Sequence, residues 1–111
     1  MIFITGPLFS GKKQVAMDLL GCTEAQLAQH AVWDVQDMVH GAADLTALAD
    51  ELAAHEVVIA TEVGSGVVPM DKDQRADREA AGRLAILLAR RAGKVIRVYC
   101  GIPTVLKEEA K

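Results

Sequence analysis

Eight residues near the start of the chain, Gly-Pro-Leu-Phe-Ser-Gly-Lys-Lys at positions 6–13, constrain the fold more than any other segment. They follow a short apolar run at 2–5 that predicts a buried strand, and they lead into residues 12–20, which predict a helix ended by Gly21. Glycines at both ends allow the backbone to curve around an anion, with its N–H groups and a helix N-terminus directed at it. The segment is therefore typical of a phosphate-binding loop.

The residues of this loop have expected roles. The positions that we expect to bind a nucleotide are Gly6, Pro7, Leu8, Phe9, Ser10, Gly11, Lys12 and Lys13. Lys12 would reach the β- and γ-phosphates. The motif normally ends in Ser or Thr, whose hydroxyl binds Mg²⁺, whereas Lys13 has no side-chain oxygen and adds a positive charge. From this segment alone, a strand–helix turn that binds nothing is the alternative.

Apolar runs and helical patterns alternate along the rest of the chain. Strands are predicted at 31–35, 57–60 and 94–99, with a short edge strand at 105–106, and helices at 23–30, 45–52 and 72–91. This alternation predicts one α/β domain over residues 1–111, with parallel strands, right-handed crossovers and flanking helices. Ligands of such sheets bind outside the carboxyl ends of the strands, so we expect the chemistry in the loops that begin at Gly6, Asp34 and Thr61.

Two carboxylates and one arginine are further candidates. Asp34 lies near the end of one predicted strand and Glu62 just past another, where a carboxylate can bind a metal such as Mg²⁺. Glu62 is also placed to accept the proton of a substrate hydroxyl. We interpret Lys12, Asp34 and Glu62 as candidate catalytic residues. Arg78 is a candidate contact for an anion. Solvated turns for the acidic residues, and a solvated helix face for Arg78, are the alternatives.

Composition excludes several classes of function. The net charge of −3 and an aromatic content of 4% argue against a nucleic-acid partner. The chain has no apolar run long enough to span a bilayer and no secretory signal pattern at its start, so we expect a cytoplasmic protein without a membrane partner. Cys22 and Cys100 form no CxxC pair, and we expect both to be reduced and buried.

Residues 62–69, Glu-Val-Gly-Ser-Gly-Val-Val-Pro, carry a resemblance to a known family. With Arg-Glu-Ala-Ala-Gly-Arg at 78–83, Val-Tyr-Cys-Gly-Ile-Pro at 98–103 and Leu-Lys at 106–107, they resemble the adenosylcobinamide kinase/adenosylcobinamide-phosphate guanylyltransferase family. The resemblance covers 57–107 and, through the loop, 1–20. It implies a P-loop NTPase-type, RecA-like, mainly parallel sheet with strand order 94–99, 2–5, 57–60, 31–35. It also implies GTP or ATP as cofactor with Mg²⁺, a corrinoid substrate, and a homo-oligomer, by resemblance a trimer.

The chain departs from the family pattern at several positions. Lys13 replaces a Ser, Thr61 replaces an Asn, and a second family Asn falls on Ala85. Nothing between Gly21 and Ala31 matches the segment with the histidine that family members guanylylate. These departures predict a weak or altered Mg²⁺ dependence and loss of the guanylyltransferase half.

Three hypotheses follow from these sequence features. The first is a nucleotide-dependent, adenosylcobinamide kinase-like protein of cobalamin biosynthesis. The second is a degenerate member that binds a nucleotide or phosphate without catalysis. The third is a metal-free anion-binding module unrelated to corrinoids.

Overall fold

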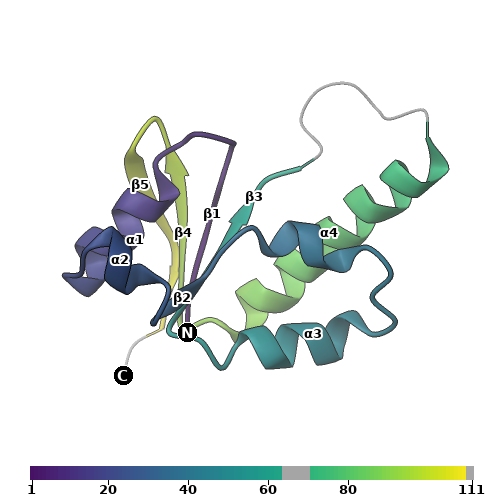
Figure 1. Ribbon diagram of the computed structural model, residues 1–111, viewed down its shortest axis with the longest axis horizontal. Coiled ribbons are helices and arrows are strands. Elements are labelled where there is room, and N and C mark those ends of the chain that lie inside the picture. The colour runs from purple at the N-terminus through teal and green to yellow at the C-terminus, as the bar shows by residue number, and fades with distance from the viewer. Residues whose placement is uncertain (64–70, 110–111) are drawn as a thin grey trace.

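Five strands, four α-helices and one 3₁₀ helix follow one another in the computed structural model, which describes residues 1–63 and 71–109. In chain order they are β1 (Ile2–Gly6), α1 (Lys12–Leu20), α2 (Glu24–Leu27), β2 (Ala31–Val32), η1 (Val35–Val39), α3 (Leu45–Leu52), β3 (Val57–Thr61), α4 (Lys72–Arg91), β4 (Lys94–Tyr99) and β5 (Ile102–Glu108) (Figure 1). Among these described residues, no helix combines the length and the apolar character that crossing a bilayer requires.

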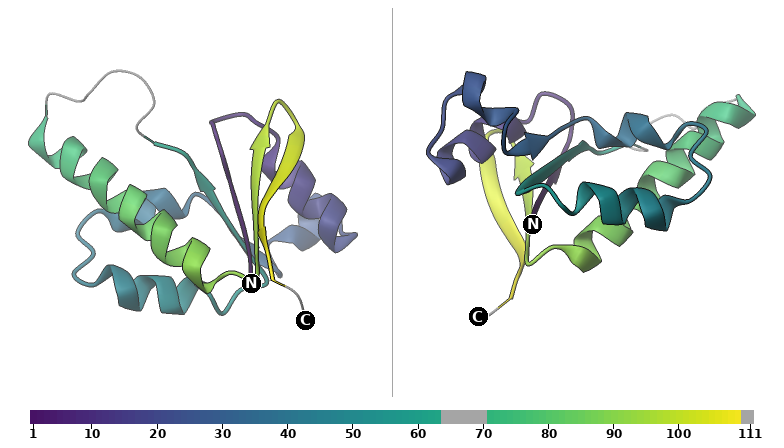
Figure 2. Two further views of the ribbon diagram at one scale, coloured as in Figure 1. Left: turned by 180° about the vertical axis from the view of Figure 1, so that it is seen from behind. Right: turned by 60° about the horizontal axis from the view of Figure 1, so that its bottom comes forward.

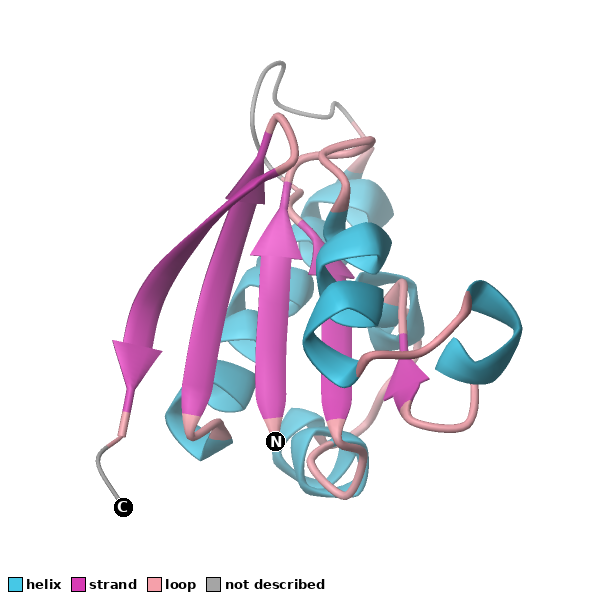
Figure 3. Cartoon of the chain, turned by 90° about the vertical axis from the view of Figure 1, so that its left-hand side faces the viewer, coloured by secondary structure: helices cyan, strands magenta, loops and turns pink. Residues whose placement is uncertain are grey.

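The strands form one sheet with the order β2-β3-β1-β4-β5 (Figure 3). β1 is parallel to both β3 and β4, and β2 is parallel to β3, which confirms the predicted α/β class and the predicted order of the four parallel strands. β5 pairs with β4 in the antiparallel direction. It is longer than the short edge strand expected at 105–106, because a tight turn at Cys100 and Gly101 returns the chain directly alongside β4.

Helices cover both faces of the sheet (Figure 2). Successive strand residues point to opposite faces, so each strand contributes to two separate cores. On one face Ile4, Ile59 and Ile96 pack with Val15 of α1 and Leu27 of α2. On the other face the buried residues include Phe3, Val58 and Val95 from the strands, with Leu52 of α3 and Leu84 and Leu88 of α4. The parallel strands therefore end at one common edge between two layers of helix.

Two local predictions were wrong. The predicted strand 31–35 is reduced to Ala31–Val32, because Asp34 adopts a left-handed backbone with φ 55° and begins η1. Cys100 is exposed rather than buried, since it occupies the β4–β5 turn with φ 52°. Cys22 is half-buried, and both thiols are unpaired.

Candidate functional site

The loop between β1 and α1 lies at the carboxyl edge of the sheet and is held in a tight curve. A Cβ atom on Gly6 would collide with the carbonyl oxygen of Val98 and would come within 2.8 Å of the Ser10 hydroxyl oxygen. Gly11 has φ 92°, a conformation that other residues rarely adopt. Both glycines are therefore required by the shape of the loop.

The turn between β4 and β5 supports this loop from the side. The backbone N–H of Gly101 donates a 2.7 Å hydrogen bond to the carbonyl oxygen of Ser10. A Cβ atom on Gly11 would lie 3.3 Å from the Cα of Gly101, so the two backbones are in close contact. Figure 1 shows the hairpin tip beside the loop that leaves β1. The β4–β5 turn thus packs against the Ser10–Gly11 part of the loop.

Lys12 lies inside the loop, with only 8% of its surface exposed. Its ammonium donates a 2.6 Å hydrogen bond to the carbonyl oxygen of Pro7. Burial lowers the pKa of Lys12, while the charges of Asp34 and Glu62 oppose that shift. A buried cation at the start of a helix, hydrogen-bonded to a carbonyl oxygen, is an arrangement that an anionic ligand would complete.

The Ser10 hydroxyl is a second unusual group in the loop. It is buried, and within the described part of the chain it has no hydrogen-bond partner. Buried hydroxyls are almost always hydrogen-bonded, because desolvation without a partner costs free energy. The loop therefore retains a donor that its own residues do not use.

A pocket of about 320 Å³ opens beside the loop. Its lining consists of residues 8–13 of the loop together with Gln14, Trp33, Asp34, Ile59 and Thr61. The segments after β1 and β2 and the end of β3 thus meet in one pocket at this edge of the sheet. The Asp34 side chain reaches this pocket because the left-handed turn ends β2 early.

The Lys13 side chain contacts Trp33, and both residues line the pocket beside the loop. Its ammonium lies 4.5 Å from the centroid of the Trp33 ring, in a cation–π contact between α1 and the residue after β2. The position that carries a hydroxyl in the usual motif is thus occupied by a cation turned toward an aromatic face. The sequence showed the substitution but not its direction.

Glu62 is engaged by Arg97, a residue that the sequence analysis did not single out. The Arg97 Nε donates to Glu62 Oε1 at 2.7 Å, and Nη2 donates to Oε2 at 3.0 Å. The hydrogen bond from Arg97 lowers the pKa of Glu62 below its usual range. The backbone N–H of Glu62 also donates to the carbonyl oxygen of Gly6 at 2.8 Å. Arg97 follows no motif, and only the β1–β4 register opposite Thr5 places it here.

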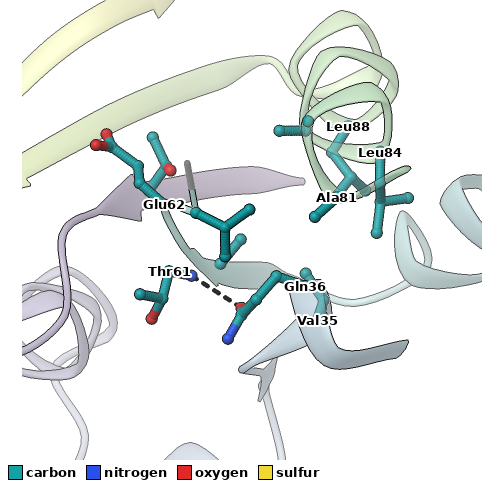
Figure 4. A pocket seen from close by; sticks show the side chains of 12 residues that line it. Val35, Gln36, Thr61, Glu62, Ala81, Leu84 and Leu88 are labelled. Atoms are coloured by element: carbon teal, nitrogen blue, oxygen red, sulfur yellow. Dashed lines mark hydrogen bonds between the residues drawn. The ribbon is translucent and has the colours of Figure 1, made fainter. Parts of the chain in front are cut away.

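A second, smaller pocket of about 110 Å³ lies on the α4 face of the sheet (Figure 4). Ala81, Leu84 and Leu88 form its α4 wall, and Glu62 lies at the end of β3 opposite them. The backbone N–H of Thr61 donates to the Gln36 side-chain oxygen at 2.9 Å. Thr61 and Ala85 both line this pocket.

The remaining candidates lie elsewhere or outside the described residues. Arg78 is half-buried on α4 and is not among the lining residues of either pocket. Residues 64–69 of the Glu-to-Pro segment lie outside the described residues. Within the described residues, no group of three or more His, Cys, Asp or Glu is placed to hold a metal ion.

The three histidines are occupied by partners away from the loop. The ring Nδ1 atoms of His30 and His40 lie 2.9 Å from Glu56 and 2.8 Å from Asp77, respectively. His55 Nδ1 lies 3.1 Å from the carbonyl oxygen of Leu52. None of the three lines the pocket beside Lys12.

Comparison with known families gives a match. The model of the family described as cobinamide kinase / cobinamide phosphate guanyltransferase matches residues 17–106. The matched range begins within α1, after the loop and Lys12, and ends within β5. No curated protein matches the chain.

Proposed function

Because this chain belongs to the cobinamide kinase / cobinamide phosphate guanyltransferase family, we propose that it is a nucleotide-dependent, kinase-like protein of cobalamin biosynthesis in which the guanyltransferase half is lost. Its fold is the α/β fold of P-loop type, with a mainly parallel sheet and flanking helices. The observation that carries the proposal is the buried Lys12 inside a glycine-bounded loop at the carboxyl end of the central strand.

In the proposed reaction GTP or ATP donates its γ-phosphoryl group to a hydroxyl of a corrinoid substrate. Loop N–H groups and Lys12 would hold the phosphates, with the Lys12 ammonium exchanging Pro7 for a phosphate oxygen. The substrate oxygen attacks the γ-phosphorus in line as the bond to the β-phosphate oxygen breaks. Lys12 then stabilises the charge that develops on the leaving diphosphate.

The two carboxylates have different environments in this proposal. Asp34 is exposed on the rim of the pocket beside the loop, so we assign it as the acceptor of the hydroxyl proton and as the remaining candidate ligand for a divalent cation. Glu62 is a weaker proton acceptor because Arg97 lowers its pKa. A weak or altered Mg²⁺ dependence is part of the proposal, since Lys13 offers no oxygen ligand.

Loss of the guanyltransferase half is supported by the positions of the histidines. A guanylylated histidine must reach the α-phosphate of the bound nucleotide, yet His30 and His40 contact carboxylates outside the pocket beside Lys12. Arg78 as a nucleotide contact, the homo-oligomer and the cytoplasmic location remain predictions from the sequence.

The second candidate function is binding of a nucleotide or phosphate without turnover. It is favoured by Lys13, which is turned onto Trp33 where the usual motif has a hydroxyl, and by the ion pair that occupies Glu62. Both features remove groups on which phosphoryl transfer normally depends, but neither blocks the loop itself.

One experiment separates these functions. The protein is titrated with GTP and with ATP by calorimetry, with and without Mg²⁺, and transfer of labelled γ-phosphate to cobinamide is measured in parallel. Binding with transfer supports the kinase. Binding without transfer supports the degenerate member, and absence of both contradicts the proposed function. The titrations are repeated on Lys12→Ala, and Lys94→Ala, a lysine substitution at the opposite end of the sheet, is the matched control.

A further inference from the structure

The two carboxylates near Lys12 are not equally available to a Mg²⁺ ion. Mg²⁺ prefers six oxygen ligands in near-octahedral geometry, some of them water and phosphate. Lys13 supplies no oxygen, and both oxygens of Glu62 are hydrogen-bonded to Arg97. Asp34 is the carboxylate that lines the pocket beside the loop, and no ion pair of Asp34 is observed within the described residues. One carboxylate without an ion pair is therefore present where the sequence led us to expect two.

Arg97 is held in this position by the sheet. It lies opposite Thr5 in the β1–β4 register. Thr5 is the residue immediately before Gly6, where the loop begins. Val95 packs in the core on the α4 face, so the alternation of β4 places Arg97 on that same face, where Glu62 lies at the end of β3. The Glu62 backbone is itself fixed by its hydrogen bond to Gly6. Arg97 and Glu62 are therefore held by β4 and by the end of β3, the two strands on either side of β1.

The contact between Arg97 and Glu62 is bidentate, and such a contact orients a carboxylate. A guanidinium donates two parallel N–H groups to two carboxylate oxygens, which neutralises the carboxylate and fixes its plane. A divalent cation at Glu62 would use the same oxygens and provide the same neutralisation. The Arg97 guanidinium and a divalent cation are therefore alternative partners of the Glu62 carboxylate. This carboxylate is near enough to Lys12 for the charge of Lys12 to act on it.

We propose that Arg97 takes the place of a divalent cation at Glu62. As a positioning residue, it neutralises the carboxylate and fixes its orientation beside the phosphate loop, so that Glu62 binds no metal. The effect on phosphates rests on the proposed function. The exclusion of metal from Glu62 does not, and it can be measured without a nucleotide.

The first test uses Mn²⁺ alone, which electron paramagnetic resonance detects directly when it is free in solution. In millimolar titrations we expect the parent protein and Glu62→Gln to bind Mn²⁺ equally, because Glu62 is already occupied. Arg97→Gln should gain binding, and the double variant Arg97→Gln/Glu62→Gln should lose that gain. Tighter binding by the parent than by Glu62→Gln, or no gain in Arg97→Gln, would overturn the proposal.

The second test measures GTP affinity with and without Mg²⁺. In Arg97→Gln the uncompensated charge of Glu62 should weaken the binding of GTP without Mg²⁺ about tenfold. Added Mg²⁺ should restore most of the lost affinity. The double variant should recover Mg²⁺-free binding without added metal. An equal loss of GTP affinity in Arg97→Gln and in the double variant would mean that Arg97 has only a structural role, which would overturn the proposal. If none of the proteins binds GTP, the proposed function fails, while the Mn²⁺ result still decides the role of Arg97.

The chain provides a matched control. Arg91 donates from Nε to Asp50 at 2.7 Å, in an arginine–carboxylate pair between α4 and α3 away from the loop. Arg91→Gln should change neither Mn²⁺ binding nor the effect of Mg²⁺ on GTP affinity. Arg97→Lys, which keeps the charge but loses the two-pronged contact, should give intermediate values in both tests. If Arg97→Gln does not fold, both tests are made with Arg97→Lys in its place.

Discussion

The ammonium of Lys12 and the carbonyl oxygen of Pro7 lie 2.6 Å apart across the loop to which both residues belong. The loop therefore uses its own backbone as the partner of its buried cation. A phosphate oxygen that enters the loop carries a larger negative charge than a carbonyl oxygen and would replace it. Ligand binding and local rearrangement of this contact are expected to occur together.

Replacement of Lys12 by Ala should weaken binding of GTP and ATP by about 1.5–3 kcal/mol, the usual size of a hydrogen bond to a charged group. The corresponding change in dissociation constant, roughly ten- to a hundredfold, is measured by calorimetry. Lys94→Ala removes a lysine that is paired with Glu108 at the start of β4, and it should leave the affinity unchanged. Equal binding by the parent and Lys12→Ala would contradict the assignment of the loop.

Replacement of Lys13 by Ser should increase the dependence of nucleotide affinity on Mg²⁺. The new hydroxyl offers an oxygen ligand, and removal of the ammonium removes a charge that repels a divalent cation. If the protein is a kinase, turnover should also rise. Trp33 is the single tryptophan and contacts Lys13, so its fluorescence provides a direct measurement of the lost contact.

The controls for this variant use the same signal. Lys13→Gln removes the charge without adding the hydroxyl at the Ser position, so it should change Trp33 fluorescence but give less gain in Mg²⁺ dependence than Lys13→Ser. Tight Mg²⁺-dependent binding with rapid turnover in the parent, lost in Lys13→Ser, would show that the role of this position has been misassigned.

The sequence predicted the sheet and the loop because both depend on local patterns. Alternation of apolar runs and helices determines parallel strands, and glycines at 6 and 11 mark the curve of the loop. Arg97 was not predicted, because its contact with Glu62 depends on the register between β1 and β4. The direction of Lys13 depends on where Trp33 is placed, and the early end of β2 depends on the backbone of Asp34. Long-range geometry, rather than residue type, determines these features.

Replacement of Gly6 by Ala should destabilise the protein. The new methyl group would collide with the carbonyl oxygen of Val98 and would approach the Ser10 hydroxyl within 2.8 Å, so β1 or the loop must shift. Overpacking of this kind typically costs about 1–3 kcal/mol, measured here by urea unfolding. Gly82→Ala is the matched control, since a Cβ there meets nothing within 4 Å on helix α4. It should be stabilising by roughly 0.5–1 kcal/mol, because Ala favours a helix over Gly.

Incubation with GTP labelled in the α-phosphate should leave no covalent adduct on the protein. The three histidines contact Glu56, Asp77 and the Leu52 backbone rather than the pocket beside Lys12. The measurement is intact-mass spectrometry together with retention of the label after denaturation. An acid-labile guanylyl group mapped to His30, His40 or His55 would contradict the loss of the guanyltransferase half.

Replacement of Arg97 by Gln should make the protein less stable at neutral pH, and this difference should disappear in acid. The hydrogen bond from Arg97 lowers the pKa of Glu62 in the folded state, so the folded carboxyl binds a proton less readily than the unfolded one. The stabilisation is therefore fully present above the unfolded pKa, about 4.3 for Glu, and is lost as the pH falls through the lower folded value. Urea unfolding of both proteins between pH 7 and pH 3 measures the difference. If the difference in the free energy of unfolding between the two proteins stays constant over this range, Arg97 stabilises the fold through packing and not through the charge of Glu62.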